Sequence, residues 1–162
     1  MVDVKERTCC FTGHREIPEE SLMEIKQRLE EQVVRLIQQG VIYYGAGGAL
    51  GFDTLAAQTI LALKNAYPQV KLILVLPCQN QSERWNRADR AIYEGILAQA
   101  DKVVYISEHY YKGCMHKRNR HLVDCSDYCI CYLNRLSGGT YYTVRYAREK
   151  GLKIINCAEQ LG

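Results

Sequence analysis

The sequence has no hydrophobic run long enough to cross a bilayer. None of its apolar stretches approaches the roughly 18 residues that a spanning helix needs, although 48% of the chain is hydrophobic. The first residues, 1–7, are largely polar and lack the apolar core of a signal peptide. We therefore expect a soluble, cytoplasmic protein with no membrane span.

The chain also lacks a strong charge of either sign. Its net charge is +3, whereas a dedicated duplex-DNA binder usually presents a strongly basic face. One local cluster of basic residues stands out, made up of Lys112, His116, Lys117, Arg118, Arg120 and His121. We therefore expect a phosphorylated small molecule as the partner and do not expect nucleic acid.

Common catalytic motifs are missing as well. There is no G-x-S-x-G nucleophile elbow and no G-x-x-x-x-G-K-[ST] phosphate loop, and G-x-G-x-x-G is matched only loosely. Asp53, Glu83 and Glu108 are the acids that can be considered as bases, but nothing in the sequence distinguishes one of them. No catalytic residue is predicted, and enzymatic activity is not the favoured interpretation.

Eight cysteines are present without the paired short spacing of a zinc site. The gaps between Cys125, Cys129 and Cys131 are three residues and one. Most of the others fall in apolar, strand-like runs, which indicates reduced core residues rather than a disulfide framework. No metal and no cofactor are predicted.

Short apolar runs alternate with amphipathic helical patterns along the whole chain. The predicted strands are 8–12, 41–44, 70–76, 102–107, 128–133 and 153–156. The predicted helices are 19–39, 54–66, 82–100, 116–125 and 140–150. Continuously apolar strands are typical of parallel sheets covered on both faces. The pattern predicts one domain over residues 1–162, a Rossmann-like three-layer α/β/α sandwich with a mainly parallel sheet.

Ligands of such sheets bind beyond the carboxyl ends of the strands, where five of the predicted loops gather. After the second strand, a loop with Gly47, Gly48 and Gly51 leads into a helix, a geometry suited to holding phosphate. Asp53 either bonds a sugar hydroxyl or caps this helix. We expect that bulky residues at Gly48 or at Gly139, in the fifth loop, abolish binding without unfolding the protein.

The other candidate ligand-binding residues lie in loops at the same edge. They are Thr12, Gly13, His14 and Arg15 after the first strand, Trp85 after the third, Arg118 and Asn119 after the fourth, and Gly138, Gly139 and Thr140 after the fifth. Trp85 either stacks on a base or covers the pocket, or it packs a helix end onto the core. The tyrosines Tyr110, Tyr111, Tyr141 and Tyr142 form either a pocket wall or a subunit interface, and a homodimer is possible.

Together, these motifs resemble the YpsA-like branch of the SLOG superfamily over nearly the whole chain. That superfamily includes the lonely-guy phosphoribohydrolases and the DNA-processing protein DprA, and the resemblance implies a Rossmann-like domain that binds nucleotides or nucleotide-derived ligands. The lonely-guy enzymes pair Met-x-x-Arg-Lys with Pro-Gly-Gly-x-Gly-Thr-x-x-Glu. Here Asn119 replaces the Lys, Ser137 replaces the Pro, and Arg145 stands where the Glu falls.

Three hypotheses follow from the motifs and the resemblance. The preferred one is a non-catalytic sensor or regulator of a nucleotide-derived ligand, in a stress, cell-division or phage-defence setting. The second is a hydrolase of a nucleotide N-glycosidic bond or a nucleotide sugar, with Asp53 or Glu108 in place of the missing acid. The third is a DprA-like binder of single-stranded DNA, which predicts salt-dependent binding to oligonucleotides.

Overall fold

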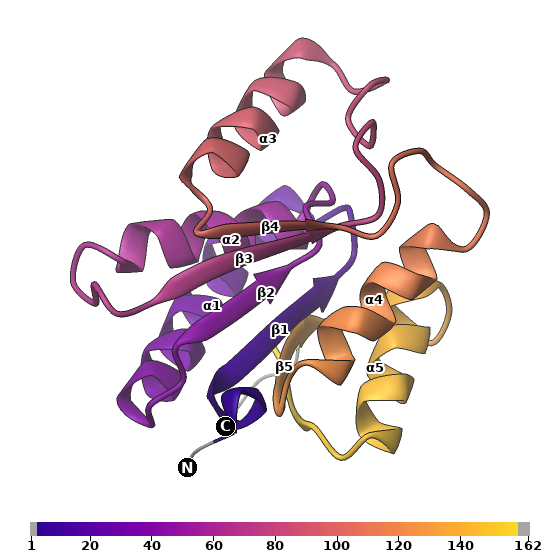
Figure 1. Cartoon of the computed structure of the whole chain (residues 1–162). Helices are drawn as coiled ribbons and strands as arrows, with labels where there is room; N and C mark the ends of the chain where they lie inside the picture. Colours follow the sequence, from indigo (N-terminus) through magenta and orange to yellow (C-terminus); the bar gives the residue numbers. More distant parts are fainter. Residues whose placement is uncertain (1–2, 159–162) are drawn as a thin grey trace.

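The fold is an open, all-parallel sheet of six strands with helices on both faces (Figure 1). This computed structural model describes residues 3–158. The strands are β1 (Thr8–Gly13), β2 (Tyr43–Ala46), β3 (Lys71–Leu76), β4 (Lys102–Tyr105), β5 (Tyr128–Tyr132) and β6 (Lys153–Asn156). Their order across the sheet is β4-β3-β2-β1-β5-β6, and all five pairings are parallel. The predicted Rossmann-like α/β fold is confirmed.

The helices divide unequally between the two faces of the sheet. They are η1 (Val4–Arg7, a 3-10 turn), α1 (Glu19–Gln38), α2 (Phe52–Leu63), α3 (Arg87–Gln99), α4 (Cys114–Asp124) and α5 (Gly139–Glu149). Helices α1, α2 and α3 pack side by side on one face, and α4 and α5 pack together on the other (Figure 1). The chain therefore forms β1 to β4 in order toward one edge of the sheet. It then returns over the opposite face through α4 and adds β5 and β6 on the other side of β1.

The larger core lies between the sheet and α1, α2 and α3, and three aromatic rings occupy its centre. Phe11 stacks on Tyr44 at 6.1 Å and meets the edge of Phe52 at 6.5 Å, and all three side chains are fully buried. Burial of each such side chain stabilises the fold by roughly 1.5–3 kcal/mol. A second, smaller core lies under α4 and α5 and includes Cys10 and Cys129.

The cysteines match the expectation of reduced core residues. None of the eight forms a disulfide, and all except Cys125 are buried. Burial is the main cause that raises the pKa of the Cys9 thiol well above its usual value. Within residues 3–158, no three His, Cys, Asp or Glu side chains are grouped so that they could hold a metal ion.

Several predicted boundaries were wrong, among them the starts of β2 and α3. The second strand begins at Tyr43 rather than Val41, whose amide is bonded to Leu36 in the turn that ends α1. Helix α3 begins at Arg87 rather than Ser82, because turns occupy the preceding residues and Asn86 caps the helix by accepting from the Asp89 amide at 2.8 Å. Gly45 thus lies inside β2, where an added Cβ would sit 2.8 Å from the side chain of Leu122 in α4.

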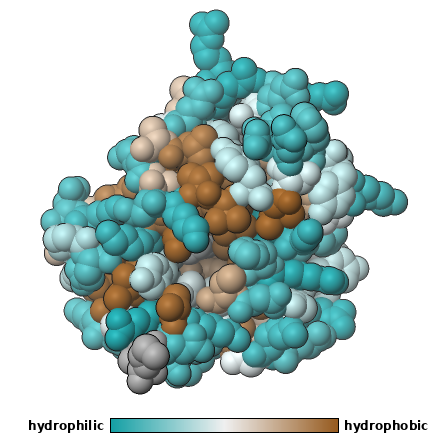
Figure 2. All heavy atoms as spheres, viewed as in Figure 1, coloured by the Kyte–Doolittle hydropathy of each residue, from teal (hydrophilic) through white to brown (hydrophobic). Residues whose placement is uncertain are grey.

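The edge strand β4 departs from the expectation that every strand is covered on both faces. Lys102 and Tyr105 at its ends are exposed, and Val103 and Val104 are half-buried. Figure 2 shows hydrophobic residues at the surface along this edge of the sheet. The central strands are more completely buried than β4, because helices pack on both of their faces.

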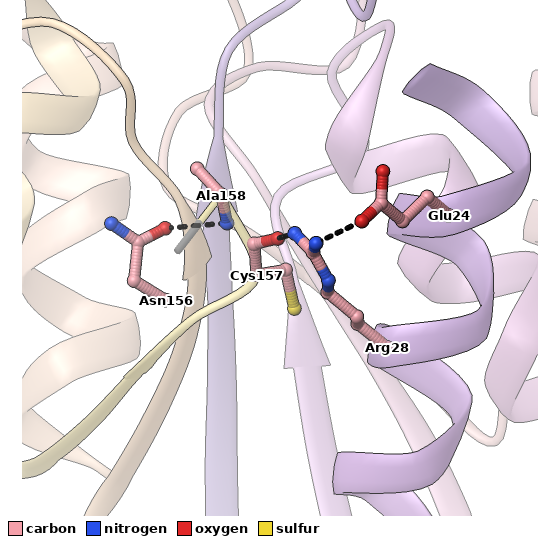
Figure 3. Close-up of polar contacts among 5 residues, drawn as sticks. All are labelled: Glu24, Arg28, Asn156, Cys157 and Ala158. Carbon is pink, nitrogen blue, oxygen red and sulfur yellow. Dashed lines mark hydrogen bonds and ion pairs between the residues drawn. The ribbon is translucent and has the colours of Figure 1, made fainter. Parts of the chain in front are cut away.

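The end of the described chain is fixed to α1 (Figure 3). Arg28 in α1 donates a hydrogen bond to the carbonyl of Cys157 at 2.9 Å and pairs with Glu24 one turn earlier. Asn156 accepts from the amide of Ala158 at 3.0 Å and also bonds both backbone groups of Leu133. These contacts join the end of β6 to the residue that follows β5 and join Cys157 to α1. No helix formed by residues 3–158 combines the length and hydropathy required to cross a membrane.

We expect Gly51→Ala to lower the free energy of unfolding by about 2–4 kcal/mol, measured by urea denaturation. Gly51 precedes α2 with φ +79°, and an added Cβ would lie 2.1 Å from the carbonyl oxygen of Arg15. The matched control is Gly95→Ala in α3, where a Cβ meets nothing within 4 Å. That change should raise stability by about 0.5–1 kcal/mol. Equal effects of the two substitutions would contradict the steric argument.

Candidate functional site

A cavity of about 450 Å³ opens beyond the carboxyl ends of β1 and β5. These two strands are neighbours in the sheet, but the connections that leave them run over opposite faces, which is where ligands of open α/β sheets bind. The lining residues come from four loops and helix starts. They are Thr12, Gly13, His14, Arg15, Glu16, Ala49, Asp53, Met115, His116, Arg118, Asn119, Arg135, Gly139 and Thr140.

Arg118 is the most buried cation of this wall, with 4% of its surface exposed. Its guanidinium donates to the carbonyl of Gly47, and its Nε donates to the side-chain oxygen of Asn119 at 2.7 Å. Burial lowers the pKa of Arg118, and the nearby Asp53 carboxylate opposes that effect. The charge is therefore held in place by the glycine loop that follows β2.

Asp53 lies in the first turn of α2 and is also buried, with 7% of its surface exposed. Its Oδ2 accepts a hydrogen bond from the amide of Ala49 at 3.2 Å. Burial raises the pKa of this carboxyl, and Arg118 works in the opposite direction. Asp53 is not the N-cap of α2, which is Gly51. Its carboxylate instead closes the loop over four residues and faces the cavity.

Gly47 occupies the space between these two charged groups. An added Cβ there would lie 2.7 Å from Nη1 of Arg118 and 2.9 Å from Oδ2 of Asp53. A side chain at this position would push both groups away. The loop thus needs a glycine to let a buried arginine and a buried aspartate approach the same stretch of backbone.

The start of α5 presents backbone amides at the cavity. The helix begins at Gly139 after Gly138, has no side-chain cap, and has no acidic residue in its first turn. Amides of a first turn have no partner within their helix, and the helix dipole adds a partial positive charge there. Gly139 and Thr140 both line the cavity. This end of α5 is suited to an anion such as phosphate.

Positive charge predominates around the opening. Arg15, Arg118 and Arg135 line the cavity, while Asp53 and Glu16 are the carboxylates among the lining residues. Asp53 interacts more strongly with Arg118 than with Arg15. Three guanidinium groups therefore stand against two carboxylates, which leaves an excess of positive charge for an added anion. Arg15 also contacts Met115 in α4, 3.6 Å from its sulfur.

His14 connects the two loops on either side of the cavity. Its Nε2 accepts a hydrogen bond from the amide of Asn134 at 3.1 Å, which requires a neutral ring with the proton on Nδ1. Burial, assisted by Arg135, lowers the pKa of His14. The ring also meets Tyr132 edge-on at 5.6 Å. His14 therefore holds the loop after β1 against the loop after β5.

The structure brings together most of the residues selected from the sequence. Nine of them line the cavity: Thr12, Gly13, His14, Arg15, Asp53, Arg118, Asn119, Gly139 and Thr140. The other five selected residues are not among its lining residues: Gly47, Gly48, Gly51, Trp85 and Gly138. Trp85 is half-buried and meets Tyr93 edge-on at 5.1 Å, packed against the larger core. These contacts agree with the packing role, and a contact of Trp85 with a ligand stays a prediction.

The expectation for Gly48 was wrong. Its φ is +72°, and an added Cβ would lie 2.5 Å from the side chain of Leu76. Its carbonyl accepts from Gln81 at 3.3 Å, in the loop after β3. A bulky residue here would disturb the fold itself. Gly139, in contrast, has nothing within 4 Å of an added Cβ, so the expectation for Gly139 is compatible with the structure.

Sequence reasoning missed five lining residues, namely Glu16, Ala49, Met115, His116 and Arg135. Arg135 has the clearest signal, because it stands just after a strand in the same loop as the selected Gly138. His116 belongs to the basic cluster noted in the sequence and precedes Arg118 by two residues. The glycines and hydroxyl side chains identify these loops in the sequence. The charged residues beside them carry no such local signal and are indicated only by their position after a strand.

The comparisons with known proteins agree on one family. The family model of YpsA, described as the YspA SLOG family, matches residues 10–154. The UPF0398 protein of Bacillus pumilus (strain SAFR-032) is 33% identical over 134 residues, which cover 81% of this chain and 72% of that protein. A UPF0398 protein of Halalkalibacterium halodurans, BH1768, is 32% identical over 129 residues, which cover 78% of this chain and 68% of that protein.

Two solved structures share the fold. DNA processing protein A from Helicobacter pylori, described for its single-stranded DNA binding mode, superposes with a TM-score of 0.67 at 22% identity. DprA from Streptococcus pneumoniae gives the same TM-score at 18% identity. Each comparison covers 94% of this chain, which spans only 66% and 50% of the two DprA chains. At these identities, the likeness concerns the fold alone.

We expect His14 to make stability fall as the pH is lowered from 7.5 to 5.5. Its folded pKa is lowered, so the unfolded chain takes up a proton near the ordinary pKa of about 6.5 before the folded protein does. The contribution is complete above that pH and is lost as the pH falls toward the folded pKa, with a slope of at most about 1.4 kcal/mol per pH unit. Urea denaturation at several pH values measures it.

The matched variant is His14→Gln, whose side-chain oxygen accepts a hydrogen bond but does not titrate in this range. The difference in unfolding free energy between wild type and variant should shrink as the pH falls. A difference that stays constant between pH 7.5 and 5.5 would show that His14 is not held neutral by its surroundings.

Proposed function

Because this chain belongs to the YpsA family of SLOG proteins, as its motifs predict, we propose that its central cavity binds the phosphate and ribose of a nucleotide or nucleotide-derived molecule. The protein acts as a sensor or regulator rather than as an enzyme. The family relationship supports the fold, and the side chains around the cavity supply the argument for the place of the site and for the ligand.

One observation carries the proposal. The uncapped start of α5 and the side chains of Arg15 and Arg135 line the same cavity. Backbone amides at a helix start bind phosphate oxygens, and guanidinium groups bind them in pairs. Both kinds of donor meet at the sheet edge where α/β folds bind ligands. A phosphate group would satisfy donors that otherwise face solvent.

The sugar has its own partners in this proposal. Thr12 and Thr140 line the cavity with hydroxyl groups, and Asn119 lines it with an amide. These groups donate and accept, as a ribose hydroxyl does. Asp53 also borders the cavity, but its Oδ2 is already bonded to the amide of Ala49. We assign Asp53 chiefly to holding the glycine loop and Arg118 in position.

A hydrolase is the less favoured alternative. The motif position that carries Glu in the lonely-guy enzymes is Arg145, whose guanidinium lies over the ring of Tyr141 at 5.7 Å and which does not line the cavity. Glu108 does not line it either. Asp53 would be the remaining candidate acid, since burial raises its pKa. Release of adenine from AMP, lost in Asp53→Asn, would establish this activity.

Single-stranded DNA is the second candidate ligand, because the structural neighbour from Helicobacter pylori is described as binding it. That likeness weakens the expectation from net charge that nucleic acid is not a partner. A DNA ligand predicts affinity for an oligonucleotide that falls steeply with salt. A small nucleotide predicts saturable binding of one molecule with a weaker salt dependence.

The regulatory setting is also part of the proposal. Seven buried thiols without disulfides fit the reducing cytoplasm. In that compartment, a nucleotide-derived signal could report stress, division or phage infection. A homodimer stays a prediction, with exposed Tyr110 and Tyr111 as candidate contacts.

We expect Gly139→Leu to abolish ligand binding while leaving the fold intact, because an added Cβ would meet no protein atom within 4 Å and the side chain would occupy the phosphate position. The measurement is a thermal-shift series with AMP, ADP, ADP-ribose, NAD, cyclic nucleotides and ribose 5-phosphate. At about a hundred times its dissociation constant, a ligand adds roughly 2.7 kcal/mol, or about 5–10 °C at this chain length. The variant should lose that shift.

The matched control is Gly95→Leu in α3, a second glycine whose added Cβ meets nothing within 4 Å but which lies outside the cavity. This variant should keep the full shift. A wild-type protein that responds to no probe, or a Gly139→Leu variant that responds like wild type, would contradict the proposed site.

A further inference from the structure

A second cavity of about 450 Å³ runs between α4 and α5 on the face opposite α1, α2 and α3. His116 and Asn119 line both this groove and the central cavity, so the two spaces adjoin. Its lining residues are His116, Asn119, Arg120, Tyr142, Thr143, Arg145, Tyr146 and Glu149. Nothing in the proposed phosphate and ribose site accounts for this groove.

The groove is lined by two rows of side chains at helical spacing. His116 and Arg120 are four residues apart on α4, and Tyr142 and Tyr146 are four apart on α5, so each pair lies on one face of its helix. The packing of α4 on α5 brings these rows opposite each other. The imidazole of His116 and the guanidinium of Arg120 therefore face two tyrosine rings across the groove, and Arg145 and Glu149 line the α5 side as well.

Tyr146 forms a fixed part of this wall. Arg120 and Lys150 lie over its ring at 5.5 Å and 5.4 Å, and its hydroxyl donates to Asp124 at 2.7 Å. That hydrogen bond is the largest cause of the raised pKa of Tyr146. The contacts over the ring and the hydrogen bond of its hydroxyl therefore hold Tyr146 in one orientation in the wall of the groove.

Tyr142 has a different environment. It is 56% exposed, and the ring contact it makes is an edge-on one with Tyr141 at 5.8 Å. An exposed aromatic ring in a cationic groove is a stacking surface for a planar, electron-rich group such as a nucleobase. Stacking on such a ring tolerates different bases, because every base has an aromatic face.

The distance between the two sites suits one molecule. Tyr142 follows Gly139 by three residues, which is about 4.5 Å along the axis of α5. A ligand with its phosphate at the start of α5 therefore needs to extend by only one sugar to reach the ring of Tyr142. His116 and Asn119, which line both cavities, lie along that path.

We propose that the groove between α4 and α5 is the base subsite of the ligand, and that the ring of Tyr142 stacks on the base. The inference rests on the proposed nucleotide function and deepens it, because it specifies a ligand with a nucleobase rather than a bare sugar phosphate. Arg145 and Arg120 add positive charge beside the stacked base, opposed within the groove by Glu149.

The experiment compares AMP with ribose 5-phosphate by isothermal titration calorimetry on wild type and Tyr142→Ala. The variant should weaken AMP binding about tenfold, equivalent to about 1.4 kcal/mol, and should change ribose 5-phosphate binding less than twofold. Tyr142→Phe keeps the ring and should bind AMP like wild type. Because Tyr142 is exposed, the substitutions should leave the fold unchanged, which a urea denaturation curve checks.

The outcomes separate this inference from the proposed function. If neither probe binds the wild-type protein, the proposed function and this inference both fail. If both probes bind but Tyr142→Ala affects them equally or not at all, the base subsite fails and the phosphate site stands. The base subsite also fails if Tyr142→Ala leaves AMP binding unchanged and instead dissociates a dimer in sedimentation velocity, or weakens binding of a twelve-residue oligo-dT.

Discussion

The burial of Arg118 beneath the glycine loop is the constraint on which the site depends. A buried charge is costly unless hydrogen bonds and opposite charge compensate it. Here the compensation comes from the carbonyl of Gly47, the side chain of Asn119 and the field of Asp53. Gly47 lies in the loop after β2, Asp53 in the first turn of α2, and Asn119 beside Arg118 in the middle of α4, so these three parts of the chain must be arranged together. Asp53, Arg118 and Asn119 all line the cavity, so the same contacts fix part of its wall.

The chemistry of the cavity follows from the charged groups and backbone amides that line it. Asp53 and Arg118 offset each other inside the wall, while Arg15, Arg135 and the start of α5 line the same cavity, with Glu16 as its second carboxylate. This distribution favours an anion and gives little to acid–base catalysis. Of the two motif positions that differ in charge from the lonely-guy pattern, Asn119 lines the cavity without a charge and Arg145 lies outside it.

Sequence reasoning succeeded for the fold because the periodic pattern of the chain is strong. The central strands are continuously apolar since helices cover both of their faces, and each helix buries one stripe. It failed where local signals resembled those of another role. Val41 is apolar like a strand residue but packs in the turn after α1, and the residues after Ser82 include helix formers but make turns until Asn86. Trp85 stands in a polar run, yet its ring packs on Tyr93.

The sequence by itself determined the alternation of strands and helices, the edge of the sheet at which the loops gather, and the family. These properties depend on short motifs and on the spacing of apolar residues, both of which are visible among residues close together in the sequence. Only the tertiary structure decided which glycines face a ligand and which face the protein. Gly48 and Gly139 look alike in the sequence, but Leu76 lies against one and open space against the other. That difference arises from atoms far away in the chain, and no local pattern carries it.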